Sequence, residues 1–260
     1  MPNVYLNYAS MTNREGIPDS EVPAVFLARL VPEIEKELER RRPGSPERIE
    51  DEQSPVDWWH YAGIAGALHE ISEGASADLS AEVTQSLLDD MEKKLATETG
   101  DERIWNYVLY ASRLRKLDIV VPDMPAAMVN EASGHVAVLR AATNPHAPWY
   151  LAYYLSHLTD LRSDVGRLVT DEDWSVFAQE ATAIFTEENI VEKDFLLAQF
   201  ITSLYSLDAD RAGLLIRGAG IDLNGVCANL RAKAEEAKTA GDGWMMQQYA
   251  RAYKQLLEVV

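Results

Sequence analysis

The sequence is poor in cysteine and has no long apolar run. Cys227 is the single cysteine of the 260-residue chain, which excludes an intramolecular disulfide and a metal cage of several cysteines, so we expect a buried structural thiol. No apolar stretch approaches the roughly 18–20 residues of a membrane helix. The first residues also lack the basic segment and apolar run of a signal peptide. We therefore expect a cytoplasmic protein without a membrane span.

Positive charge is scarce as well. The chain has 24 Lys and Arg residues against 42 Asp and Glu residues, and its formal net charge is −18. Such a surface repels phosphate backbones and anionic membranes, so nucleic acid is not an expected partner. Two interpretations of the charge stay open: it keeps the protein in solution, or it attracts a basic protein.

The motifs of common enzyme classes are missing too. The chain has no phosphate-binding loop, no Gly-x-Ser-x-Gly and no His-Glu-x-x-His. Divalent metal sites in helical bundles combine imidazole and carboxylate ligands at helical spacing, so a metal-dependent helical enzyme is the alternative hypothesis. The pairs with that spacing are His69 with Glu73, Glu131 with His135, and His157 with Asp160. Carboxylates are abundant enough to produce such pairs by chance, so we predict no cofactor and expect His157 to be hydrogen-bonded between helices.

Helical periodicity runs along the chain. Apolar residues at helical spacing from Val22 to Leu38 predict a first helix, and a polar loop from Gly44 to Pro55 follows it. The segment Thr170–Asp173 has the form of a capping box that opens a later helix. No convincing run of alternating β-branched residues occurs, so an all-α fold is expected.

Four aromatic residues, which we call the anchors, stand 46, 44 and 46 residues apart: Trp59, Trp105, Trp149 and Phe195. Apolar residues follow each anchor at offsets 2, 5, 6, 9 and 12, which trace one face of a helix. The residue at offset 9 is always leucine: Leu68, Leu114, Leu158 and Leu204. The residue at offset 7 is always small, which would let a neighbouring helix approach closely: Gly66, Ser112, Ser156 and Thr202. This pattern predicts a repeat of about 45 residues.

A second helical segment follows each leading helix, near residues 79–97, 125–142, 172–186 and 208–240. These second segments align poorly with one another, as expected if they vary at a binding surface while the leading helices keep the stacking constant. The period and the helix pairs over roughly residues 57–240 resemble the HEAT/armadillo superfamily. The resemblance implies an α-solenoid of about four helix-pair repeats with capping helices at both ends. An irregular multi-helix bundle is the alternative.

The expected domain organisation follows from this pattern. Residues 1–56 would form an N-terminal segment with a capping helix and an acidic linker, and residues 57–260 the repeat domain, with residues 243–260 as its terminal cap. The expected function is that of a non-enzymatic binding module, of the inhibitor, immunity or adaptor type, whose acidic surface meets a basic protein. The expected contact residues lie opposite the apolar stripes of the second helices: Glu82, Asp89, Lys93, Asn130, Glu131, Glu172 and Gln179.

Overall fold

The protein is all-helical throughout the part of the chain that the structure describes. The computed structural model describes residues 23–46, 58–72, 79–122, 124, 126–144, 146–162, 165–187 and 192–259. These ranges contain only helices and connecting turns, with no strand. The predicted all-α fold is confirmed. Most of the predicted polar loop, and Glu73, lie outside the described residues.

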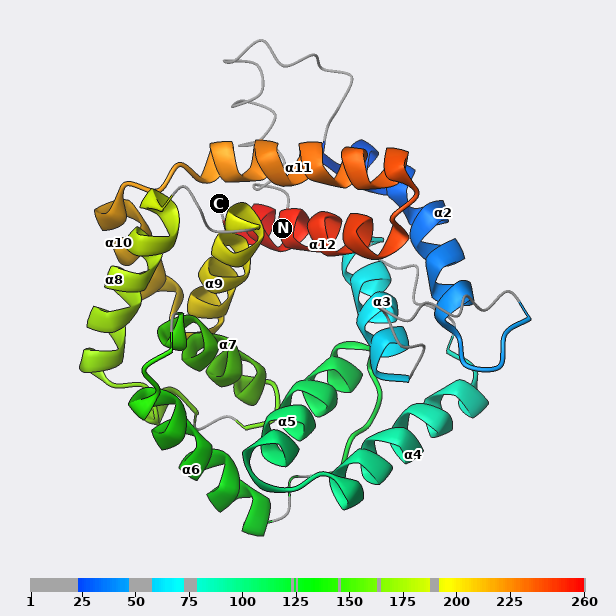
Figure 1. Ribbon diagram of the computed structural model, residues 1–260, viewed down its shortest axis with the longest axis horizontal. Helices are drawn as coiled ribbons and strands as arrows, with labels where there is room; N and C mark the ends of the chain where they lie inside the picture. Colours follow the sequence, from blue (N-terminus) through cyan, green and yellow to red (C-terminus); the bar gives the residue numbers. More distant parts are fainter. Residues whose placement is uncertain are drawn as a thin grey trace.

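The helices form an inner and an outer layer (Figure 1). The inner layer consists of α3 (Trp58–Ile71), α5 (Gly100–Lys116), α7 (Ala147–Thr159), α9 (Lys193–Leu207) and α12 (Gly243–Val259). The outer layer consists of α2 (Pro23–Arg41), α4 (Ala81–Thr97), α6 (Ala126–Ala141), α8 (Asp171–Thr186), α10 (Ala209–Ala219) and α11 (Leu223–Ala240). A short 3-10 turn, η2 (Val165–Arg167), joins α7 to α8.

The inner helices close into a ring (Figure 1). Along the ring α3 contacts α5, α5 contacts α7, α7 contacts α9 and α9 contacts α12, which in turn contacts α3. The segment expected to be a terminal cap is therefore an inner helix. A cap would leave one face to solvent, whereas α12 has α3 and α9 on its flanks and α2 and α11 behind it.

The four leading helices of the predicted repeat are the inner helices α3, α5, α7 and α9. Their offset-9 leucines are all buried, with at most 3% of the residue exposed. Helix α12 follows the pattern in part: the buried Tyr253 and Leu256 occupy offsets 6 and 9 from Gln247, whereas offset 7 is Lys254 rather than a small residue. Gln247 takes the place of an anchor. It stands 52 residues after Phe195 because two outer helices, α10 and α11, intervene, so a search for a period of 45 does not find it.

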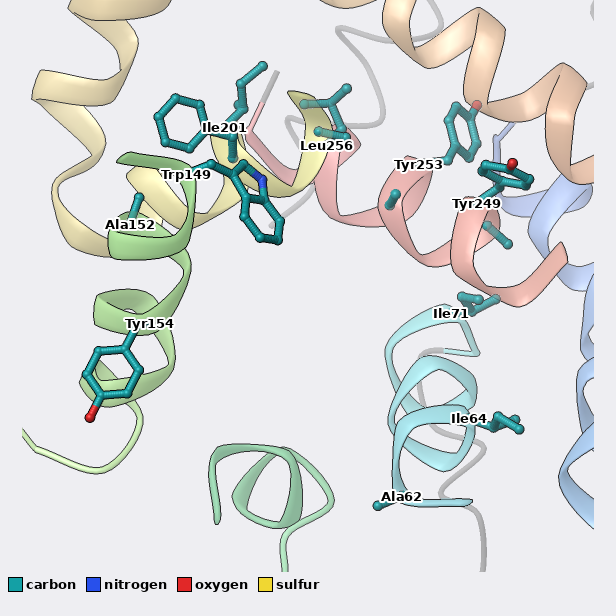
Figure 2. Packing of buried hydrophobic residues seen from close by; sticks show 14 of the residues in the cluster. Ala62, Ile64, Ile71, Trp149, Ala152, Tyr154, Ile201, Tyr249, Tyr253 and Leu256 are labelled. Atoms are coloured by element: carbon teal, nitrogen blue, oxygen red, sulfur yellow. The ribbon is translucent and has the colours of Figure 1, made fainter. Parts of the chain in front are cut away.

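One hydrophobic cluster extends through both layers and includes the N-terminal helix α2. The rings of Phe26 in α2 and Tyr253 in α12 meet edge to face, with centroids 5.5 Å apart. Figure 2 shows Tyr249 and Tyr253 projecting from α12, and Ile64 projecting from α3. The expected boundary near residue 56 thus separates two stretches that share a core.

Local sequence signals fix several helix ends. The predicted capping box is confirmed: the Thr170 hydroxyl accepts from the backbone N–H of Asp173, whose carboxylate accepts from the backbone N–H of Thr170. The same carboxylate accepts from Arg140 at 2.6 and 2.8 Å, which ties α6 to α8. Helices α10 and α11 end at Gly220 and Gly241, whose positive φ angles suit glycine. No described helix combines the length and the apolarity needed to span a bilayer.

Candidate functional site

The five inner helices line a central cavity of about 520 Å³. Each of them contributes polar side chains to it: Glu70 from α3, Lys116 from α5, Tyr153 and His157 from α7, Gln199 and Ser203 from α9, and Gln248, Arg251 and Gln255 from α12. Its volume lies within the range of small-molecule binding sites. The central cavity is therefore the candidate functional site.

The cavity-lining residues occupy one face of the repeated helix, which we call the inward face. Ten of the eighteen lining residues stand at three offsets: offset 4 (Tyr153, Gln199, Arg251), offset 8 (His157, Ser203, Gln255) and offset 11 (Glu70, Lys116, Ser206, Glu258). At about 100° per residue, the centre of these offsets lies about 130° around the helix from the centre of the apolar stripe at offsets 2, 5, 6, 9 and 12, which we call the packing face. The leading helices therefore carry a variable polar face, which we had expected only on the second helices.

A hydrogen-bond network joins α5 to the end of α7. The Ser112 hydroxyl lies 2.7 Å from Nδ1 of His157 and donates to the Asp160 carboxylate at 2.5 Å. Because a hydroxyl has one hydrogen, it then accepts from the Nδ1–H of His157, and Nε2 of the neutral ring is an acceptor. Lys116 lies 3.6 Å from the same carboxylate. The prediction that His157 is hydrogen-bonded between helices is confirmed.

The electrostatic surroundings of His157 are cationic. Burial lowers the pKa of His157 well below its ordinary value of 6.5, and the charges of Lys116, Arg113 and Arg251 lower it further. The ring is therefore neutral at pH 7. The order of the contacts also differs from a catalytic triad, because the hydroxyl of Ser112 donates to Asp160 rather than to the imidazole.

A second network connects α3 with α12 across the ring closure. Glu70 accepts two hydrogen bonds from Arg251, at 2.7 and 2.9 Å, and one from Gln255 at 2.7 Å. Burial raises the pKa of Glu70, but the charge and hydrogen bonds of Arg251 outweigh this effect and hold the pKa below its ordinary value of 4.5. The bidentate pair fixes the Arg251 guanidinium at the cavity wall.

Arg113 adds a positive charge close to the cavity. Its guanidinium lies 3.8 Å from the centroid of the Trp59 ring, which is a cation–π distance. It also lies beside Gly63, where an added Cβ atom would be in van der Waals contact with the guanidinium at 3.6 Å. Among the described residues no carboxylate forms an ion pair with Arg113. Since Glu70 is paired with Arg251 and Asp160 with Lys116, the Arg113 charge remains uncompensated.

Two amide side chains in the cavity have unused hydrogen-bonding capacity. Gln199 of α9 and Gln248 of α12 line it, and their amides form no side-chain hydrogen bond within the described ranges. An amide offers both donors and an acceptor. The cavity thus combines free amides and an acceptor nitrogen on His157, and the charge of Arg113, unpaired within the described residues, lies near it.

Comparison with known proteins does not extend this description. No protein-family model matches the chain, and neither does a curated protein or a solved structure. The chemistry of the site therefore rests on its own residues.

The contact residues expected from the sequence lie on α4, α6 and α8 in the outer layer, and all are exposed: Glu82, Asp89, Lys93, Asn130, Glu131, Glu172 and Gln179. Two of them have side-chain partners. Asp89 accepts from Gln85 at 2.7 Å, and Glu131 lies 3.5 Å from Arg103. The residues spread over three helices and line neither the central cavity nor a common recess.

The histidine–carboxylate pairs do not assemble into a metal site in the part of the chain that is described. No group of three His, Cys, Asp or Glu side chains is placed there to hold an ion. His157 and Asp160 are connected through the Ser112 hydroxyl. His135 has the carboxylate of Asp101 at 3.5 Å, which is a single possible ligand rather than a set. Cys227 is buried as expected, and burial raises the pKa of its thiol to about 12.

Proposed function

We propose that the protein binds a small organic anion in the central cavity. The observation that carries this proposal is the convergence of the inward faces of all five inner helices on one polar cavity of about 520 Å³. The Glu70–Arg251 pair and the Ser112–His157–Asp160 network help to hold the ring together, but Gln199 and Gln248 line the cavity without side-chain partners among the described residues and need another reason. Burying polar groups without such a reason lowers stability.

The charge of the ligand follows from the charges around the cavity. Although the whole chain carries a net charge of −18, three cations surround His157: Arg113, Lys116 and Arg251. Lys116 is balanced by Asp160, Arg251 by Glu70, and the lining carboxylate Glu258 by Lys254. Within the described part of the chain, Arg113, which does not itself line the cavity, supplies the one remaining positive charge for a carboxylate or phosphate group. Gln199, Gln248 and Nε2 of His157 would bind the polar remainder of the ligand.

The test is a panel of small molecules measured by thermal shift and calorimetry: acetate, succinate, citrate, inorganic phosphate and glycerol phosphate, with putrescine as the cationic control. We expect at least one anion to bind and putrescine not to bind. Lys116→Gln should weaken that binding about tenfold, as expected for the loss of one charged contact.

The matched control is Glu258→Gln, which changes an exposed carboxylate at the same offset of α12. It should leave anion binding equal or slightly stronger, because it removes a negative charge from the cavity wall. Binding of putrescine alone, or anion binding that Lys116→Gln leaves unchanged, would contradict the proposal.

We also infer that the five inner helices are copies of one repeated helix-pair unit, as in an α-solenoid. The shared offsets of anchor, small residue and leucine on α3, α5, α7 and α9 support this inference. The partial match of α12 adds a fifth copy. The cytoplasmic location expected from the sequence stays a prediction.

A second candidate function, recognition of a basic protein by the outer layer, is favoured by the exposure of all seven expected contact residues. Affinity capture from a native lysate should recover a basic partner in a salt-sensitive manner. The charge-reversed variant Asp89→Lys/Glu172→Lys should lose it. Equal recovery of the partner by the wild type and by the charge-reversed variant would contradict binding through Asp89 and Glu172.

A further inference from the structure

A second recess, which we call the lateral recess, lies where the start of α5, the end of α6 and the start of α7 meet. Its volume is about 360 Å³. Its main lining residues are Asp101, Glu102 and Trp105 from α5, His135 from α6 and Tyr150 from α7. None of these residues lines the central cavity, so the lateral recess is a separate site.

His135 is the feature of this recess that the fold does not explain. Only 6% of the residue is exposed, and both of its ring nitrogens are buried without a hydrogen-bond partner. Asp101 is its nearest carboxylate, at 3.5 Å, but forms no hydrogen bond with it. A buried polar group without a partner costs about 1–3 kcal/mol, so a ligand that bonds to the imidazole would recover this energy.

Aromatic rings surround the imidazole. His135 lies edge to face with Tyr154, at 4.9 Å between centroids, and Trp105 stacks on Tyr154 at 5.5 Å. The Tyr154 ring, which projects from α7 in Figure 2, is buried and its hydroxyl has no hydrogen-bond partner either. Tyr150, which is 39% exposed, meets Trp105 at the entrance. The recess therefore offers the π-faces of Trp105 and Tyr150 beside the unpartnered imidazole of His135.

The charge of the lateral recess is negative. Asp101 and Glu102 are exposed at its entrance, and no Lys or Arg is among its lining residues. The neighbouring cation, Arg103, is directed to Glu131 at 3.5 Å. Carboxylates also stabilise the start of a helix, so their position alone would not indicate a ligand. Together with the buried His135 and the aromatic wall, they describe a site for an organic cation.

We propose that the lateral recess binds a guanidinium group. A guanidinium is planar and can stack on an indole ring, and its five N–H donors suit two carboxylates and one imidazole acceptor. The group could belong to an arginine side chain of a protein or to a free guanidino compound. Both sources present the same chemistry to Asp101, Glu102, Trp105 and His135.

The test uses the full-length protein and three probes: methylguanidinium, arginine amide and the peptide Gly-Arg-Gly. Citrulline amide, which keeps the α-amino group and has a neutral ureido group in place of the guanidinium, serves as the ligand control. We expect calorimetry to show that arginine amide binds at least about tenfold more tightly than citrulline amide, because the ureido group lacks the charge. Tighter binding of Gly-Arg-Gly than of arginine amide would assign the site to a protein side chain, and the reverse order to a free compound.

Two variants locate the binding. Asp101→Asn/Glu102→Gln should weaken arginine-amide binding about tenfold, and Trp105→Phe about threefold, because phenylalanine keeps the packing and has a weaker cation–π interaction. Glu258→Gln and Lys116→Gln, which change residues of the central cavity, are controls and should leave it unchanged. Equal binding of arginine amide and citrulline amide, or unchanged binding in the carboxylate variant and in Trp105→Phe, would overturn the proposal.

Discussion

The two faces of the inner helices differ in what their residues have in common. The packing face repeats from helix to helix, with a buried leucine at offset 9 in each of α3, α5, α7 and α9. The inward face does not repeat: offset 4 is tyrosine in α7, glutamine in α9 and arginine in α12. Both faces belong to the same helices, so constancy marks the structural positions and variation marks the positions that surround the central cavity.

The largest expected effect is on the packing face. Leu158→Ala removes a fully buried side chain and should lower the free energy of unfolding by about 2–5 kcal/mol in urea titrations. The control is Leu214→Ala in α10, where the side chain is 65% exposed and the loss should stay within about 0.5 kcal/mol. Similar losses in both variants would remove the distinction between packing positions and surface positions.

A smaller effect is expected where an inward-facing residue also closes the ring. Glu70→Gln breaks the bidentate pair with Arg251 and should lower the free energy of unfolding by about 2 kcal/mol at pH 7. Because the folded state lowers the pKa of Glu70, its contribution is complete above the ordinary value of 4.5 and disappears as the pH falls below it. The difference between wild type and variant should therefore shrink in acid. A difference that is constant down to pH 3 would contradict the pairing.

The neutral state of His157 predicts a pH effect nearer neutrality. The unfolded chain takes up a proton on this histidine below its ordinary pKa of 6.5, whereas the folded protein does not, so stability is lost as the pH falls. Between pH 7 and 5.5 the wild type should lose about 1 kcal/mol more than His157→Asn, which retains a donor to Ser112. Parallel stability curves for the two proteins would show that His157 is charged in the fold.

One buried anchor position should gain stability on substitution. Gln247 replaces an anchor in α12, is fully buried, and has no hydrogen-bond partner for either amide atom. Gln247→Met keeps a similar volume without polar atoms and should raise the free energy of unfolding by about 1 kcal/mol. The adjacent Gln248→Met is the control, because Gln248 lines the central cavity and should give no gain. If Gln247→Met were less stable than the wild type, the Gln247 amide would have to form hydrogen bonds in the folded protein.

The smallest effect on stability is expected in the outer layer. Asp89→Lys/Glu172→Lys changes two exposed side chains and should alter the free energy of unfolding by no more than about 0.5 kcal/mol. A larger loss in thermal or urea unfolding would show that these residues contribute to the fold rather than to a surface that is available to a partner.

The sequence predicted much of the fold and little of the candidate site. Periodicity located the four leading helices and their buried leucines, because a packing position constrains residue type directly. The capping box at Thr170 and the hydrogen-bonded His157 were also predicted. The inward face was not, because its residues share no chemical type. The offsets that line the cavity could have been derived by continuing the repeat alignment to the polar positions outside the packing face.

The sequence by itself determined that this protein is helical and which stripe each leading helix buries, since both follow from spacing within about a dozen residues. Only the tertiary structure decided that α12 closes the ring, since contacts of Glu70 with Arg251 and Gln255 join residues 181 and 185 positions apart. Ring closure turns separate polar faces into one cavity. No local pattern encodes it, because it depends on the summed curvature of all the helix pairs.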